Sequence, residues 1–201
     1  KTSFTERQLR LQIIPQIIES LSALHMLGIA HRGLCPANLF YQDASCQEII
    51  LGECFTSPPG MRLAPGYEPI ESASAIPEGR GEGDVEHDMF ALGALIMSLY
   101  AGKDLGAMPP QPAGEMFEQQ MVARIRQDSY RGLGGGREVT GSLSELLRGL
   151  LDDRADKRWD VDDVKRWLEG IPARTQAADE RWSLVRPVNF GGKTIHDRRH
   201  L

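Results

Sequence analysis

Apolar residues recur at helical spacing over several stretches of the chain, and this pattern predicts a largely helical domain. The first stretch, Leu9–Leu24, has one broad apolar face and follows a capping box at Thr5–Gln8. Pro15 should loosen one turn of this helix, and Gly28 should close it. The periodicity by itself indicates a core helix and no particular function.

A second stretch, residues 88–102, is apolar nearly all round, which predicts a helix at the centre of the domain. Asp88, at its start, is expected to cap it and to complement its dipole. Further helices are expected over residues 114–128, 142–151 and 161–168, the second of them capped by Ser142. Short strands are expected at 39–41 and 48–51, and again around a Gly–Gly turn within 186–195. Residues 72–84 are expected to form a mobile loop.

Composition narrows the class of protein. The chain has 201 residues, of which 41% are hydrophobic and 25% charged, as in a globular domain. Its net charge of −5 argues against nucleic acid as a partner. No apolar run approaches the ~18–20 residues of a membrane span. The three cysteines are odd in number and lack metal-ligand spacing, which favours a reducing, cytoplasmic compartment.

The uneven distribution of charge and the positions of the motifs divide the chain into two parts. Residues 1–170 are expected to form one domain, and residues 171–201 a linker or strap leading to a following module. Because the chain starts at Lys1, we expect it to be a fragment of a longer protein. His196 and His200 could share a helix face as metal ligands, but without a third ligand a solvated basic face is the preferred interpretation.

The stretch with the most chemical information is His31-Arg32-Gly33-Leu34-Cys35-Pro36-Ala37-Asn38. It resembles the catalytic loop of protein kinases, whose usual form is H-R-D-L-K-P-x-N. Two positions that carry chemistry differ, because Gly33 stands where the family has Asp and Cys35 where it has Lys.

Three further motifs follow in the family's order: Pro69-Ile70-Glu71, the helix that starts at Asp88, and a turn containing Arg158. Together the motifs resemble the C-terminal lobe of a protein kinase, which implies a mainly α domain with a few short strands. Gly66-Tyr67-Glu68-Pro69-Ile70-Glu71, which contains the first of these three motifs, is similar to the form of that motif in bacterial kinases, and this similarity implies a bacterial protein. No motif of the N-terminal lobe is found in this chain.

The resemblance also assigns roles to residues. It implies structural anchors at His31, Arg32, Glu71, Asp88 and Arg158. In the family, the residue at Asp88 holds the backbone of the catalytic loop. The residue at Glu71 is buried there and pairs with the arginine at Arg158.

The chemistry of the family depends on residues that this chain lacks. The catalytic Asp orients and deprotonates the substrate hydroxyl, a contribution of typically ~10²–10⁴-fold that Gly33 cannot make. Cys35 cannot supply the cation of the family's Lys. Asn38 remains as a potential metal ligand, and Glu53 replaces the metal-binding Asp of D-F-G with a side chain one methylene longer.

The resemblance therefore implies a pseudokinase, a scaffold that binds a protein partner or regulates an attached domain. It leaves open whether the chain is an enzyme, and no cofactor is expected. The alternative is a divergent kinase that holds Mg-ATP through Asn38 and Glu53, with an N-terminal lobe upstream and another acid, such as Asp43, as base. A redox or nucleophilic role for Cys35 or Cys54 is a third hypothesis, against which an inert cysteine is preferred.

Overall fold

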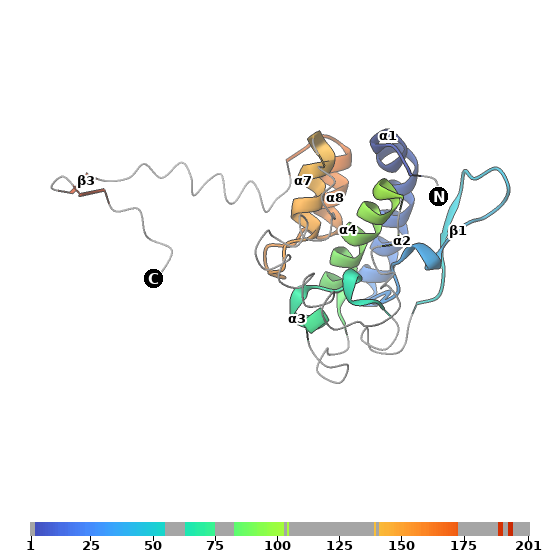
Figure 1. Ribbon diagram of the computed structural model, residues 1–201, viewed down its shortest axis with the longest axis horizontal. Helices are drawn as coiled ribbons and strands as arrows, with labels where there is room; N and C mark the ends of the chain where they lie inside the picture. Colours follow the sequence, from blue (N-terminus) through green and yellow to red (C-terminus); the bar gives the residue numbers. More distant parts are fainter. Residues whose placement is uncertain are drawn as a thin grey trace, which may run out of the picture.

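The structure is a computed structural model, and its ribbon is drawn in Figure 1. It describes residues 3–54, 63–74, 83–102, 104, 139, 141–172, 189–190 and 193–194. The predicted helix over residues 114–128, residues 75–82 of the predicted mobile loop and the two C-terminal histidines lie outside the described residues.

The first long helix is built from three consecutive segments: α1 (Glu6–Gln8), the π-helical η1 (Leu9–Ile13) and α2 (Ile14–Met26). The predicted capping box is confirmed, since Gln8 N donates to Thr5 Oγ1 at 3.2 Å and Thr5 N donates to Gln8 Oε1 at 3.0 Å. The wide π turn lies directly before Pro15, where the sequence predicts a loosened turn. Gly28 closes the helix with a φ of +70°, as predicted.

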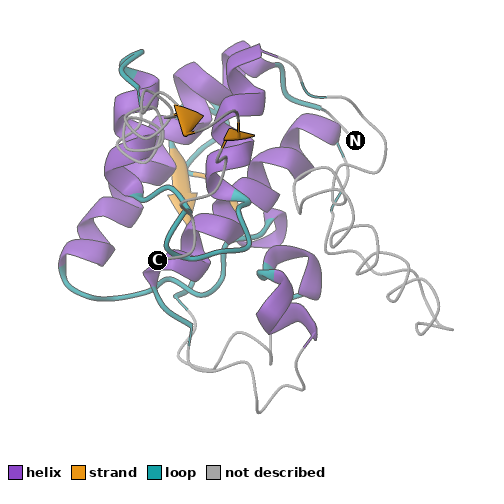
Figure 2. Ribbon diagram, turned by 90° about the vertical axis from the view of Figure 1, so that its left-hand side faces the viewer, coloured by secondary structure: helices purple, strands orange, loops and turns teal. Residues whose placement is uncertain are grey.

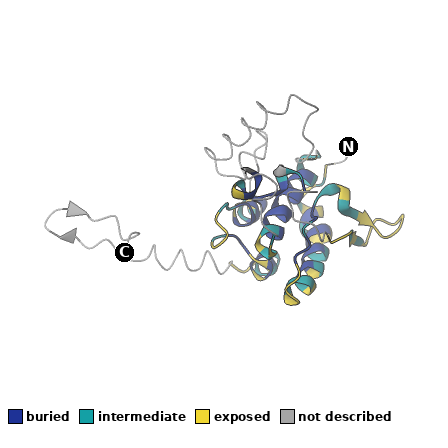
Figure 3. Cartoon of the chain, turned by 90° about the horizontal axis from the view of Figure 1, so that it is seen from below, coloured by how far each residue is buried: buried dark blue, intermediate teal, exposed yellow. Residues whose placement is uncertain are grey.

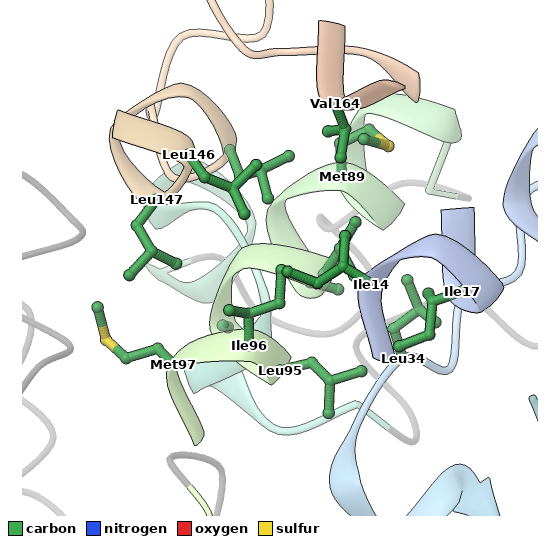
Figure 4. Packing of buried hydrophobic residues seen from close by; sticks show 14 of the residues in the cluster. Ile14, Ile17, Leu34, Met89, Leu95, Ile96, Met97, Leu146, Leu147 and Val164 are labelled. Carbon is green, nitrogen blue, oxygen red and sulfur yellow. The ribbon is translucent and has the colours of Figure 1, made fainter. Parts of the chain in front are cut away.

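Helix α4 (Val85–Ala101) lies at the centre of the described helices, between α2 on one side and α7 and α8 on the other (Figure 1). Every residue from Asp88 to Ser98 is buried, which confirms the prediction of a central helix. Figure 4 shows its residues Leu95 and Ile96 packed among side chains of the neighbouring helices. Burial of apolar area on all sides of α4 is the main stabilising contribution to this core.

The predicted start of this helix is wrong by one turn. The N-cap is Asp84, whose backbone is extended and whose side chain accepts a hydrogen bond from His87 N at 3.3 Å. Asp88 lies inside the first turn and is buried, so its carboxylate is available to another part of the chain.

Helices α7 (Gly141–Leu150) and α8 (Val161–Leu168) complete the core. The predicted leucine face of α7 is confirmed, because Leu146, Leu147 and Leu150 are all buried. The predicted cap at Ser142 is wrong, because α7 already begins at Gly141. The Ser142 hydroxyl donates instead to Glu6 Oε1 at 2.7 Å. A capping box formed by Asp160 and Asp163 starts α8.

The strands are short compared with the helices, as Figure 2 shows. β1 (Leu39–Tyr41) and β2 (Ile49–Leu51) pair antiparallel, with Phe40 opposite Ile50. This hairpin contacts α2 through Gln16, which accepts from Ile49 N at 2.8 Å. Its outer side is exposed (Figure 3). A second antiparallel pair, β3 (Asn189–Phe190) and β4 (Lys193–Thr194), agrees with the strands predicted around the Gly–Gly turn.

Two smaller elements connect this core to the candidate site. The helix α3 (Ile70–Ser74) occupies the first part of the predicted mobile loop, so residues 72–74 are helical and that part of the prediction is wrong. The 3₁₀ turn η2 (Pro36–Asn38) ends the loop that follows α2. Within the described part of the chain, none of the helices has the length and apolar character needed to cross a membrane.

Candidate functional site

The loop over residues 31–38 is held by a buried carboxylate of the central helix. Asp88 Oδ2 accepts a hydrogen bond from His31 N at 2.6 Å, and Asp88 Oδ1 accepts one from Arg32 N at 2.8 Å. His25 Nε2 lies 3.0 Å from Asp88 Oδ2. A carboxylate in the core requires such partners because desolvation of an unpaired charge is costly. The resemblance implies a link between Asp88 and the backbone of this loop. The hydrogen bonds from His31 N and Arg32 N to the Asp88 carboxylate form such a link.

His25 is a member of this group that the sequence reasoning missed. It lies in the last turn of α2, four positions after the buried Leu21, and is largely shielded from solvent. A histidine on the apolar face of a helix was the available signal, because such a side chain needs a hydrogen-bond partner in the core.

The backbone of Arg32 has a φ of +61°, which lies in the left-handed region that non-glycine residues rarely adopt. Such a conformation costs of order 1–3 kcal/mol and persists where the surroundings hold it. The hydrogen bond of its amide to Asp88 provides part of that hold, and Arg32 Nε donates to Gly83 O at 3.2 Å. The loop geometry therefore depends on the start of α4.

His31 points into the core and is buried. Its Nδ1 accepts a hydrogen bond from Gly33 N at 3.2 Å. Burial lowers the pKa of His31, and the nearby Asp88 carboxylate and the Gly52 backbone oppose this only in part. No described residue meets hydrogen-bond geometry at Nε2, although the Gly52 backbone lies near enough to influence the ring. His31 is thus a neutral packing residue of the loop.

The two degenerate positions lie between His31 and η2. Gly33 is buried and offers only its backbone, with its carbonyl accepting from Asn38 Nδ2 at 3.0 Å. Cys35 is half-buried, and burial raises the pKa of its thiol although the Ala37 and Asn38 amides act in the opposite direction. Burial, and then the charge of Asp88, likewise raises the pKa of Cys54. Both thiols are therefore poor nucleophiles at neutral pH, which disfavours the cysteine hypothesis.

Asn38 and Glu53 lie together, but they meet through main-chain groups of Glu53. Asn38 Nδ2 donates to Glu53 O at 2.9 Å, and Glu53 N donates back to Asn38 Oδ1 at 3.1 Å. With the bond to the Gly33 carbonyl, both the nitrogen and the oxygen of the carboxamide have partners. Asn38 therefore ties the loop to the end of β2.

Gly52 explains why this tie is possible. A Cβ atom at this position would lie 1.9 Å from Asn38 Oδ1 and 2.8 Å from the Phe40 ring. Any side chain would displace the carboxamide, so the position requires glycine. No motif or periodicity of the sequence indicates this requirement.

A kinase-like fold implies a metal-bound nucleotide, so the two residues can be tested for that role. The Glu53 side chain is exposed, whereas the Asn38 oxygen is already occupied by the Glu53 amide. Mg²⁺ demands near-ideal octahedral oxygen geometry, and here a ligating Asn38 would have to share or give up its backbone bond. Within the described ranges, no group of three or more His, Cys, Asp or Glu side chains could hold a metal ion. The pair fits a metal poorly.

The second anchor differs from the prediction. Glu71 was expected to be buried against Arg158, yet Glu71 is exposed on the first turn of α3 and the buried glutamate of this segment is Glu68. Arg158 donates instead to three backbone carbonyls, those of Asp152 at 2.9 Å, Glu86 at 2.8 Å and Asp153 at 3.0 Å. Its guanidinium also lies over the Phe90 ring, 5.3 Å from the centroid.

Comparison with known proteins gives a coarse assignment. No family model matches the chain. Human calcium/calmodulin-dependent protein kinase type 1B is 27% identical over 187 residues, covering 85% of this chain and 49% of the kinase. Rat serine/threonine-protein kinase SBK2 is 27% identical over 175 residues, covering 82% of this chain and 48% of that protein. The chain thus spans about half the length of these relatives.

A solved structure agrees in fold. Rad53 residues 1–466, crystallised with AMP-PNP, superposes with a TM-score of 0.58 over 83% of this chain and 41% of that one, at 15% sequence identity. The motifs in their order, the link from Asp88 to the loop and these similarities support the protein kinase superfamily. The chain has a largely helical, protein-kinase-like fold.

Proposed function

We propose that this chain is the C-terminal lobe of a pseudokinase, which does not carry out ordinary phosphotransfer and serves as a protein-interaction or regulatory scaffold. Gly33 has no side chain that could orient or deprotonate a substrate hydroxyl. Cys35 has no cationic group to neutralise a transferring phosphoryl group.

The observation that carries the proposal is that the Asn38 side chain forms hydrogen bonds to the protein backbone. Its carboxamide is the one potential metal ligand retained from the family's loop, and it is bonded to the backbone of Gly33 and Glu53. In this arrangement the side chain stabilises the loop itself. A loop fixed in this way keeps its shape without metal or nucleotide, as a scaffold requires.

The buried bonds of Asp88 support the same conclusion. They keep the loop in one defined conformation although two positions of its catalytic motif have changed. Exposed apolar side chains next to this loop, Met26 and Leu27 at the end of α2 and Phe40 on β1, offer area for a protein partner. The bacterial and cytoplasmic assignments stay predictions, because they rest on the Gly66–Glu71 motif and the cysteine count.

Calorimetric titration tests the proposal. We expect no heat when Mg-ATP, or ATP with EDTA, is added to the protein at millimolar nucleotide. Glu53→Ala is the matched variant, and it should behave as the unchanged protein does. Metal-dependent heat that disappears in Glu53→Ala would overturn the proposal.

The exposed Glu53 carboxylate beside Asn38 favours one alternative, a divergent ATP-binding kinase with residual activity. The two functions differ in the fate of the γ-phosphate. Incubation with γ-labelled ATP and a general protein substrate should leave the label on ATP if the chain is a scaffold. Transfer that is lost in Asn38→Ala and Glu53→Ala, but kept in the surface variant Asp156→Ala, would establish the alternative.

A further inference from the structure

A serine, a histidine and an aspartate form a hydrogen-bonded chain at the start of α4. Ser72 Oγ, on α3, lies 3.0 Å from His87 Nε2, on the first turn of α4. His87 Nδ1 lies 2.5 Å from Oδ1 of Asp84, the N-cap of the same helix. Serine, imidazole and carboxylate in this order are the arrangement by which a general base activates a serine.

His87 Nδ1 has two neighbours in Asp84: the carboxylate oxygen at 2.5 Å, and the backbone N at 3.4 Å, whose N–H points at the ring in the capping box. We assign the ring proton to Nδ1, where it is donated to the closer partner, the carboxylate. In the neutral ring, Nε2 is then the acceptor, and the Ser72 hydroxyl donates to it. This is the tautomer in which a histidine can take the serine proton.

The carboxylate is ionised in this arrangement. Burial alone would raise the pKa of Asp84, but the hydrogen bond from His87 holds it below its usual value. Asp84 is fixed in turn, because its Oδ1 also accepts from His87 N at 3.3 Å as part of the helix cap. The orientation of the imidazole therefore follows from the way α4 begins.

We propose that Ser72 is a nucleophilic serine, with His87 as its general base and Asp84 as the residue that orients the imidazole, and that it accepts acyl groups from small activated esters. The site is independent of the proposed scaffold function. It uses none of the residues of the loop over residues 31–38.

The step balances as an acyl transfer. Ser72 Oγ forms a bond to the ester carbonyl carbon while the bond from that carbon to the leaving oxygen breaks, and the serine proton passes to His87 Nε2 and on to the leaving group. Water then hydrolyses the acyl-serine, with His87 taking the water proton and returning a proton to Ser72. No oxidant, metal or cofactor takes part.

Exposure sets the class of substrate. Ser72 is 7% exposed, whereas the side chains of His87 and Asp84 are 28% and 64% exposed. Solvent thus reaches the base and the acid more freely than the nucleophile. A group that arrives at the hydroxyl must be small, so we expect acetyl esters to react and bulky acyl esters to be excluded.

The test is to incubate the protein with p-nitrophenyl acetate and to locate the acetyl group by peptide mass spectrometry. We expect a 1:1 acetyl adduct on Ser72 and none in Ser72→Ala. His87→Gln should slow acylation by about 100-fold or more, the lower end of what a general base provides. Asp84→Asn should also slow it, because the amide no longer holds the imidazole in the tautomer whose Nε2 accepts the serine proton.

Ser20→Ala is the matched control, since Ser20 is a half-buried serine whose hydroxyl donates to the Gln16 carbonyl at 3.0 Å and not to a histidine. It should acylate at the unchanged rate. Thermal unfolding of each variant separates lost reactivity from lost fold, and Ser72→Cys, tested by alkylation with and without His87, provides a second nucleophile if Ser72→Ala does not fold. No adduct on Ser72 at millimolar ester, or an equal rate in folded His87→Gln, would show that the three residues serve only to tie α3 to α4.

Discussion

Asp88 and Arg158 are buried residues of opposite charge that stabilise two different parts of the fold. Asp88 accepts hydrogen bonds from the amides of His31 and Arg32, so it fixes the loop that follows α2. Arg158 donates to the carbonyls of Asp152, Asp153 and Glu86, so it fixes the turn between α7 and α8 against the start of α4.

The two residues differ in the side chains that they contact in addition to these backbone groups. Asp88 is also bonded to the His25 ring, whereas Arg158 lies over the Phe90 ring and the expected carboxylate partner, Glu71, is exposed. Both residues thus make direct hydrogen bonds to main-chain groups. Burial lowers the pKa of Arg158, and the charges of Asp153, Asp152, Asp84 and Glu71 oppose this.

The largest effect is expected at Asp88. Asp88→Ala leaves the His31 and Arg32 amides and the His25 ring without their acceptor, which should lower the free energy of unfolding by about 3–5 kcal/mol. Urea denaturation measures this value. The exposed Asp156→Ala should change it by less than ~0.5 kcal/mol. Equal stabilities of the two variants would mean that the carboxylate does not hold the loop.

The next effect separates Arg158 from Glu71. Arg158→Met should cost about 2–3 kcal/mol because three carbonyls lose a charged donor. Glu71→Ala should cost less than ~0.5 kcal/mol, since its side chain is exposed. A double-mutant cycle measures the coupling energy between the two positions. A coupling energy near the full cost of Arg158→Met would restore the buried pair that the resemblance implied.

A smaller effect is expected at Gly52. Gly52→Ala places a Cβ 1.9 Å from Asn38 Oδ1, and the overpacking should destabilise the protein by about 1–3 kcal/mol. Asn38→Ala removes the clashing atom, so the double variant should recover part of that loss relative to the sum of the single changes. If the destabilisation of the double variant equalled the sum of the two single effects in thermal or urea unfolding, Gly52 and Asn38 would not be in direct steric contact as the structure has them.

The smallest effect is a pH dependence from His31. Burial lowers its pKa in the folded protein, so the unfolded chain binds a proton at a higher pH than the folded one. The stability that His31 contributes is present above ~6.5, the ordinary histidine value, and is lost as the pH falls through its lower folded value. Urea midpoints at several pH values should show this decline, and it should be shallower in His31→Gln.

The sequence alone predicts the helices well where their stabilisation is local. The capping box at Thr5–Gln8, the buried face of α7 and the fully buried α4 follow from spacing and composition, because these are properties of one segment at a time. The start that the sequence predicts for α4 lies one turn too late, because both Asp84 and Asp88 can cap a helix and only the folded backbone shows which one does.

The site was less predictable, because its geometry joins residues far apart in the sequence. The resemblance gave the link from Asp88 to the loop, but it gave a wrong environment for Glu71 and no indication of His25. The reciprocal bonds between Asn38 and the Glu53 backbone depend on how closely Gly52 lets the two segments approach. No periodicity or motif encodes such an approach.

The bonds of Asp88 also set an order of events during synthesis. Asp88 lies 57 residues beyond His31 and 56 beyond Arg32, so the loop leaves the ribosome long before the carboxylate that holds it. Until α4 is made, the hydrogen bond to Asp88 cannot hold Arg32 in its left-handed backbone conformation. A nascent chain halted between the loop and α4 should therefore carry a compliant stretch where the finished protein has a fixed one, and the final shape of the loop is acquired late.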